Sequence, residues 1–124
     1  MISLNVKNGT SKLEERLKRL SKNDKVLSIL NRYGERGVKA LSDATPIDSG
    51  ETARSWSYEV VNKNGRYKIE FDNSNVNDGV SIAIILQYGH GTRNGGYVQG
   101  IDYINPALKP VFDDMVAELT KEVS

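Results

Sequence analysis

The 124-residue chain has no cysteine, a single histidine and no long apolar run. The lack of cysteine excludes disulfides, thiolate catalysis and the common zinc sites, and it fits a reducing compartment. One histidine cannot build a multi-histidine metal site. The longest apolar run, VSIAIIL, is far too short to span a bilayer, and the first residues do not resemble a signal peptide. We therefore expect no metal, no cofactor and no membrane contact.

The chain also has almost no excess of positive over negative charge, because its net charge is only +1. Its distribution is uneven: residues 1–40 carry ten Lys or Arg against four acids, and residues 41–124 carry seven against twelve. Such polarity favours either a basic face for nucleic acid or head-to-tail contact between copies. A solvated basic helix face is the third interpretation.

The length and an ordinary composition, 38% hydrophobic and 27% charged, predict one soluble globular domain over residues 1–124. Residues 1–44 are expected to be helical. Ser11 and Glu14 form a capping-box pattern at the first helix, and a second apolar stripe runs from Asp24 to Asp43. Two glycines in this second helix predict a bend or a close contact with another helix, namely Gly34 and Gly37.

Residues 54–104 are expected to be rich in β-structure. Two alternating segments, WSYEVV and RYKIEFD, flank the turn sequence NKNG and predict a β-hairpin. NSNVNDG reads as a loop, and YVQGIDYI as a strand. The apolar residues 80–88 fit a buried helix or a buried strand, and we favour a short helix. The last helix is expected over residues 105–123, with Asn105 as its cap and Pro106 at its first helical position. The chain is thus predicted to be α+β, with a small antiparallel sheet packed by N-terminal helices and a C-terminal helix.

The glycine-rich stretch GHGTRNGGYVQG follows Tyr88 and holds five of the eleven glycines. It lacks the Lys-Ser/Thr pair of a P-loop, and a strand rather than a helix is expected after it, so a phosphate site is disfavoured. Two extended arms around Asn94-Gly95 instead predict a hairpin. His90 has no evident nucleophile to serve, so catalysis is disfavoured as well. Residue types enriched at protein interfaces stand in or beside this hairpin: Tyr88, Arg93 and Tyr97.

Nucleic-acid binding is the alternative function. Four cations at helical spacing line one flank of the first predicted helix, Lys12, Arg16, Arg19 and Lys22. Glu14 and Glu15 interrupt this flank, and no recognisable helix-turn-helix or stacking-aromatic motif accompanies it.

Three stretches, in this order, resemble the tailed-phage neck and tail-completion morphogenesis family of the Hong Kong phage type. ATPIDSGETARSW resembles the family signature TP-x-[DT]-[ST]-G-x-x-x-x-S. IAIILQYGHGTRNGGYVQG resembles its YA-x-x-x-E-[FY]-G-[TH]-G stretch, and IDYINPALKPVFDDM is similar to its proline-alanine entry into the last helix. Together they cover roughly residues 40–115.

The resemblance carries over residue by residue. The positions that match are expected to define the fold: Pro46, Asp48, Ser49, Gly50 and Ser55 in the first stretch, Tyr88, Gly89, His90 and Gly91 in the second, with Gly95 nearby, and Pro106 and Ala107 in the third. The chain departs from the family at Thr52 or Ala53, where leucine is common, and at Gln87, where an acid is common.

The resemblance implies a virion structural protein without catalytic residues, working at the head–tail junction. It implies a ring of identical copies that joins the portal side of the capsid to the tail, assembled in the host cytoplasm. The expected partners are the chain itself and other neck and tail proteins, namely a connector, a tail terminator or a tail tube, with non-specific contact to DNA in the channel. The expected interface residues are Tyr88, His90, Arg93, Tyr97, Arg16 and Arg19.

Overall fold

The structure is a computed structural model that describes residues 2–5, 24–46, 50–63 and 66–123. Helices and small antiparallel sheets are mixed along the chain, which confirms the α+β class. In chain order the elements are β1 (Ile2–Asn5), α2 (Asp24–Ala44), α3 (Gly50–Ala53), β2 (Trp56–Lys63), β3 (Arg66–Asn73), β4 (Val76–Asn77), β5 (Val80–Ser81), α4 (Ile82–Tyr88), β6 (Gly89–Gly91), β7 (Tyr97–Gln99) and α5 (Ile104–Val123).

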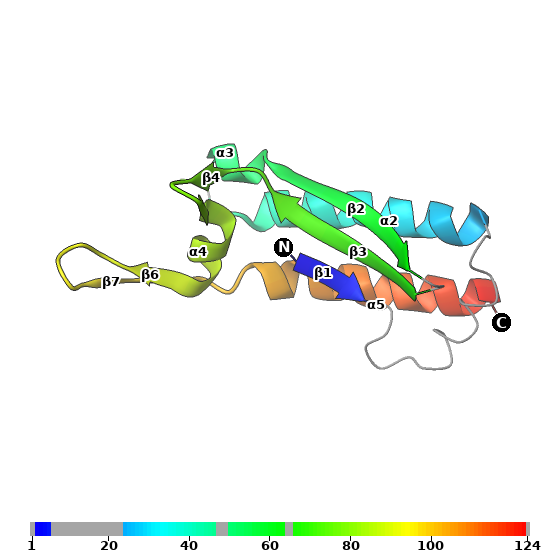
Figure 1. Cartoon of the computed structure of the whole chain (residues 1–124). Coiled ribbons are helices and arrows are strands. Elements are labelled where there is room, and N and C mark those ends of the chain that lie inside the picture. Colours follow the sequence, from blue (N-terminus) through cyan, green and yellow to red (C-terminus); the bar gives the residue numbers. More distant parts are fainter. Residues whose placement is uncertain (1, 6–23, 47–49, 64–65, 124) are drawn as a thin grey trace.

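The three-stranded sheet β1-β3-β2 and the helices α2 and α5 form what we call the body. The two long helices lie side by side, run in opposite directions and cover one face of the sheet (Figure 1). β2 and β3 form the predicted hairpin, with Trp56 opposite Asn73 and Lys63 opposite Arg66. β1 pairs with the other edge of β3, and this strand has no counterpart in the sequence-based expectations.

The hydrophobic core lies between the sheet and the two helices. The apolar positions of α2 and α5 recur at helical spacing, and those of β3 alternate, so each element turns one apolar face inward. The fully buried side chains include Val26, Leu30, Leu41, Ile69, Phe71, Met115 and Leu119. The apolar stripe predicted from Asp24 to Asp43 is therefore confirmed, and α5 has an apolar face of the same kind.

The two glycines of α2 are positions of close contact. A Cβ atom added to Gly34 would lie within 3.0 Å of the Tyr58 ring, and one added to Gly37 would lie equally close to the Phe71 ring. The missing side chains let two aromatic rings of the sheet settle against the helix backbone. Of the two roles predicted for these glycines, the structure shows the close contact, and the partner is the sheet instead of another helix.

Ion pairs join α2 to α5. Arg32 pairs with Glu118, and Arg36 Nη2 lies 2.9 Å from Asp114 Oδ2. Lys25 lies 3.7 Å from Glu122. Asp114 hydrogen-bonds Arg36 and raises the pKa of its guanidinium above the usual value. Some cations of the basic residues 1–40 therefore pair with acids of the acidic residues 41–124 within one subunit. Only the charged side chains outside these pairs are available to another molecule.

Several boundaries differ from expectation. The predicted loop after β3 contains a two-residue hairpin, β4–β5, which turns at Asp78 and Gly79, both with positive φ. The favoured short helix is confirmed as α4. The predicted strand over YVQGIDYI was too long, because only Tyr97–Gln99 pairs with another strand. The first predicted helix lies outside the described residues, and so do the last two residues of the NKNG turn.

The start of α5 also corrects the expected cap. The helix begins at Ile104, so Asn105 lies inside its first turn. The Asn105 amide donates a hydrogen bond to Asp102 Oδ1 at 3.1 Å, and the donors at the helix start bind another side chain, described below. Ends of helices commonly shift by one or two residues, but here a tertiary contact decides the position.

Candidate functional site

The predicted Asn94-Gly95 hairpin is confirmed as β6–β7, which extends away from the body (Figure 1). We call residues 89–99 the hairpin arm. His90 is paired with Val98, and Gly91 with Tyr97. Thr92 N–H donates to the Gly96 carbonyl at 2.9 Å, and Gly95 N–H donates to the Thr92 carbonyl at 3.2 Å. These two hydrogen bonds and the φ of 79° at Gly95 describe a turn that ends in one left-handed residue, which is a common form of three-residue hairpin loop.

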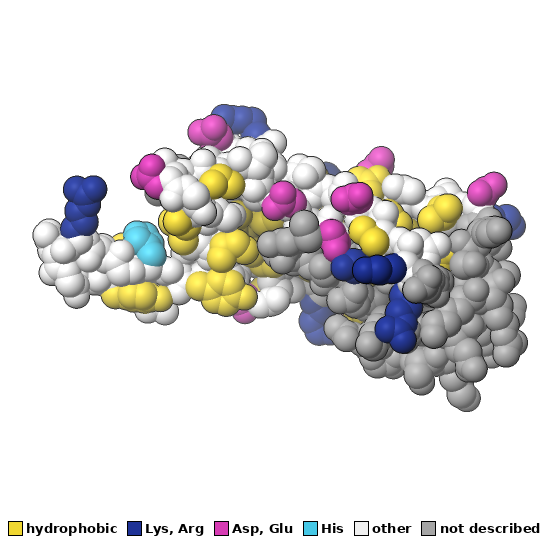
Figure 2. Space-filling view, viewed as in Figure 1, with side chains coloured by type: hydrophobic (Ala, Val, Ile, Leu, Met, Phe, Trp, Pro, Cys, Tyr) yellow, Lys and Arg dark blue, Asp and Glu magenta, His cyan; other side chains and the backbone are white. Residues whose placement is uncertain are grey.

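Large apolar side chains are exposed on and beside the hairpin arm. Tyr88 is 66% exposed, Tyr97 63%, Ile101 59% and Val98 47%. Single exposed apolar residues are common on proteins, but a cluster of them on one projecting element is typical of a surface that another protein covers. Space-filling atoms show this group at the narrow end of the molecule (Figure 2).

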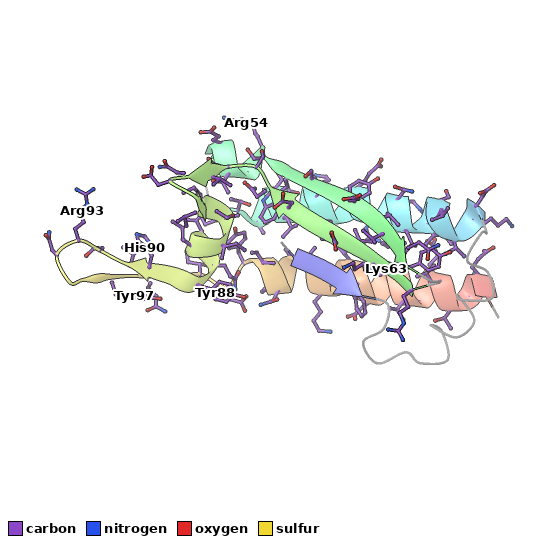
Figure 3. The ribbon with its side chains drawn as sticks, viewed as in Figure 1. Arg54, Lys63, Tyr88, His90, Arg93 and Tyr97 are labelled. Carbon is purple, nitrogen blue, oxygen red and sulfur yellow. The ribbon has the colours of Figure 1, made fainter. Side chains whose placement is uncertain are left out.

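The hairpin arm has two different sides. His90 and Arg93 point to one side, and Tyr88 and Tyr97 point to the other (Figure 3). The sequence from Gly79 to Ile101 contains no acidic residue, so the cationic side has no acid of its own. Of the interface residues expected from the sequence, four are thus brought to the hairpin arm and its base, whereas Arg16 and Arg19 lie outside the described residues. The nucleic-acid alternative stays a prediction for the same reason.

Glycine is required where the hairpin arm joins α4. Gly89 has φ 81°, and a Cβ atom there would lie 2.6 Å from the Tyr97 hydroxyl oxygen. That hydroxyl donates a hydrogen bond to the Tyr88 carbonyl at 2.6 Å. The tyrosine side chain thus crosses from β7 to the start of β6. At the tip, by contrast, a Cβ atom on Gly95 would meet no atom within 4 Å.

The base of the hairpin arm is held by Gln87, which is 7% exposed. Its Oε1 accepts hydrogen bonds from the backbone N–H groups of Tyr103, at 3.0 Å, and Ile104, at 2.9 Å. Its Nε2 donates to Asp102 Oδ1 at 2.6 Å. The side chain therefore satisfies donors at the start of α5 that have no partner within the helix. The family that the sequence resembles commonly has a carboxylate at this position. An amide, unlike a carboxylate, can accept from these backbone donors and donate to an aspartate at the same time.

Tyr103 links the same base to α4 from inside. Its hydroxyl donates a hydrogen bond to the Ala83 carbonyl at 2.7 Å, and its side chain is 5% exposed. Burial raises the pKa of Tyr103 to about 12. The sequence marked this residue only as part of a strand, and its position before a helix entry gave no sign of the contact.

The family comparison decides what kind of protein carries this arm. Residues 11–90 match the family described as "Bacteriophage HK97-gp10, putative tail-component". The chain belongs to this family. No curated protein and no solved structure matches the chain. The matched region runs through α2, the β2–β3 hairpin and α4 and ends in β6, so the tip of the hairpin arm, β7 and α5 lie beyond it.

The first family signature forms a buried junction in this tail-component chain. Thr45 Oγ1 accepts a hydrogen bond from Trp56 Nε1 at 3.0 Å, directly before Pro46. Ser55 Oγ donates to the Glu51 carbonyl at 2.7 Å, and its own carbonyl accepts from Ser74 N–H. Asp48 and Ser49 lie outside the described residues. Gly50 begins α3 and Ser55 directly precedes β2, so both lie in the segment that joins α2 to the sheet.

The departure at Thr52 also has a structural explanation. The Thr52 side chain is 1% exposed, and its hydroxyl accepts a hydrogen bond from Asn75 Nδ2 at 2.8 Å. The Thr52 carbonyl accepts from Asn73 Nδ2, also at 2.8 Å. A leucine there would lose the hydrogen bond to Asn75, so Thr52 and the two asparagines, Asn73 and Asn75, fit together as one hydrogen-bonded group.

In the third family stretch, Ala107 N–H donates to the Tyr103 carbonyl at 3.2 Å, and Pro106 lies in the first turn of α5. Within the described ranges, no group of three or more histidine or acidic side chains could hold a metal ion. None of the helices in those ranges combines the length and the apolar character needed to cross a membrane.

Proposed function

We propose that copies of the chain assemble into a ring at the junction of the phage capsid and tail, and that the ring joins the portal side of the capsid to the tail. A phage tail component is a structural protein of the virion and contacts other phage structural proteins. The neck position, the ring and the partners beyond the chain itself are the proposal: a connector, a tail terminator or a tail tube, around a channel through which DNA passes.

The hairpin arm is the observation that carries this proposal. It places exposed Tyr97 and Val98 away from the body, with exposed Tyr88 at its base, where their own subunit does not cover them. A projecting element that fits a different surface of the next copy makes a heterologous contact, and such contacts close into a ring when the rotation between copies allows it. A stable contact of this kind buries about 1,200–2,000 Å² in total.

The test is the mass of the purified chain by light scattering, with negative-stain microscopy of the same sample. We expect a discrete oligomer with a ring outline. Tyr88→Ser with Ile101→Ser should shift it toward monomer, because both side chains are more than half exposed and are available to a partner. The matched control is Val76→Ser with Val80→Ser, which removes exposed apolar side chains from β4 and β5. A wild-type chain that stays monomeric alone and with tail proteins contradicts the ring.

A further inference from the structure

A groove between α2 and β2 offers a surface that the function described so far does not use. It is lined by Glu35, Val38, Trp56, Ser57 and Tyr58 and has a volume of about 370 Å³. β2 is the last strand in the sheet order, so no described strand covers its outer edge. The floor of the groove is aromatic and aliphatic, and one carboxylate stands at its side.

The carboxylate of Glu35 has no cationic partner among the described residues. The neighbouring cations of α2 are turned elsewhere, since Arg32 pairs with Glu118 and Arg36 with Asp114. Its charge nevertheless reaches the groove: burial and then the nearby Glu35 carboxylate raise the pKa of the Tyr58 hydroxyl. The groove therefore combines aromatic surface with an uncompensated negative charge, which suits a guanidinium group.

The tip of the hairpin arm has the complementary chemistry. Arg93 lies at the exposed end of the turn, and no described acid pairs with it. Thr92, Gly95 and Gly96 keep the rest of the tip small. The strand rise of about 3.3 Å per residue lets the tip reach roughly 16 Å beyond Gly89. Because the hairpin arm extends away from α2 and β2, its tip does not lie over the groove of its own subunit (Figure 1).

We propose that the tip of the hairpin arm of one copy inserts into the groove between α2 and β2 of a second copy, where Arg93 pairs with Glu35. This inference rests on the proposed self-assembly and specifies its contact. The contact joins two different surfaces, so each copy gives one arm and receives one, as a closed ring requires. The partner is a second copy because the unpaired cation and the unpaired carboxylate belong to the same chain.

Charge reversal tests the pairing. Arg93→Glu and Glu35→Arg should each weaken self-association by about tenfold or more, because each places like charges in contact at a close ion pair. The double variant restores the pair in reversed order and should recover most of the affinity. Lys63→Glu makes the same charge change at an exposed position at the far end of β2 and should leave association unchanged (Figure 3). Circular dichroism checks that each variant stays folded.

Crosslinking tests the geometry in the otherwise unchanged chain. The natural chain has no cysteine, so an Asn94→Cys, Ser57→Cys double variant carries the only two thiols. A short bifunctional thiol reagent should give a ladder of covalent oligomers, each link joining one copy to the next. The control is the double variant Asn94→Cys, Lys63→Cys, whose second thiol lies at the far end of β2. It should give far less of the covalent oligomers.

The outcomes separate this inference from the proposed ring. Oligomers that form without the specific ladder, and without recovery in the reversed double variant, overturn the insertion and leave the ring standing. A ladder of open oligomers without ring outlines supports the insertion and contradicts the ring. A chain that does not associate with itself at any concentration, either alone or with tail proteins, overturns both.

Discussion

Glycine serves opposite purposes in the body and at the tip of the hairpin arm. In the body, Gly34 and Gly37 lie in regular helix, and aromatic rings fill the space that a side chain would take. At the tip of the hairpin arm, Gly95 is needed for its positive φ, and the space around it is empty. The same residue type thus permits packing in one region and backbone turning in the other.

The difference teaches where the shape of each region comes from. The body is determined by side chains that fit against each other, so it tolerates little change in volume. The tip of the hairpin arm is determined by local backbone geometry and a few hydrogen bonds, so it tolerates changes of side chain as long as the turn survives. A region of the second kind can adjust to a partner without cost to the core.

The largest effect is expected from Gly37→Val. The new side chain would overlap the ring of Phe71, which is 0% exposed and packed in the core. Overpacking of this kind should lower the free energy of unfolding by roughly 3 kcal/mol or more. Urea denaturation measures it.

Gly34→Val is the matched comparison for that prediction. Its ring neighbour, Tyr58, is only half-buried and lies at the edge of the groove, so it can swing outward. We expect a clearly smaller loss. Equal losses for the two variants would contradict the view that burial of the ring, and not the glycine position, decides the cost.

Tyr103 provides the next largest effect, at the junction of the body and the hairpin arm. Its pKa is about 12 in the folded protein against 10.0 in the free side chain, so the folded state keeps its proton longer. Its contribution to stability is complete below pH 10 and is lost as the pH rises toward 12, by about 2 kcal/mol over that interval. Denaturation at a series of alkaline pH values should show this loss. Tyr103→Phe, which has no proton to lose, should reduce the slope.

Gln87→Glu is expected to cost roughly 1 kcal/mol at neutral pH, because the new carboxylate would face Asp102 where an amide now donates. The two backbone donors at the start of α5 would still be satisfied. Adding Asp102→Asn restores a donor and should return the stability. If the double variant is no more stable than the single one, charge repulsion is not the cause. Thermal unfolding at pH 7 and at lower pH provides the measurement, and protonation of the carboxylate pair should reduce the loss.

The smallest effect should come from Gly95→Ala. A left-handed alanine costs about 1 kcal/mol locally, yet nothing packs against this position. The global free energy of unfolding should fall by no more than about 1 kcal/mol, because this local strain is the only expected loss. A large global loss would show that the tip of the hairpin arm folds as part of the body and would remove the contrast between the two regions.

Patterns that repeat along the chain were enough to predict most of the body. The apolar spacing of α2 and α5 and the alternation of β2 and β3 are local signals, because burial of one face imposes them on every turn or every second residue. The Asn94-Gly95 pair predicted the hairpin arm for a similar reason, since the turn itself demands these residues.

What the sequence did not reveal depends on contacts between distant residues. β1 is a strand because it pairs with β3, and the pattern of its four residues is too short to predict that pairing. Gln87 binds the start of α5 from 16 and 17 residues away along the chain. The expected cap at Asn105 was wrong because the Gln87 side chain accepts the hydrogen bonds of the donors at this helix start. The groove at Glu35 likewise exists only once α2 and β2 lie together.

The sheet order has a consequence for how the chain is made. Ile2 pairs with Phe71, so during synthesis β1 must wait for a partner that is about 70 residues behind it. At a synthesis rate of about 5–20 residues per second, the wait is roughly 4–14 seconds. The β2–β3 hairpin, whose strands are neighbours in the sequence, can form as soon as β3 has been made, and it then offers β1 an edge. We expect the sheet to form from this hairpin outward, and α5, which follows in the sequence, to close the core.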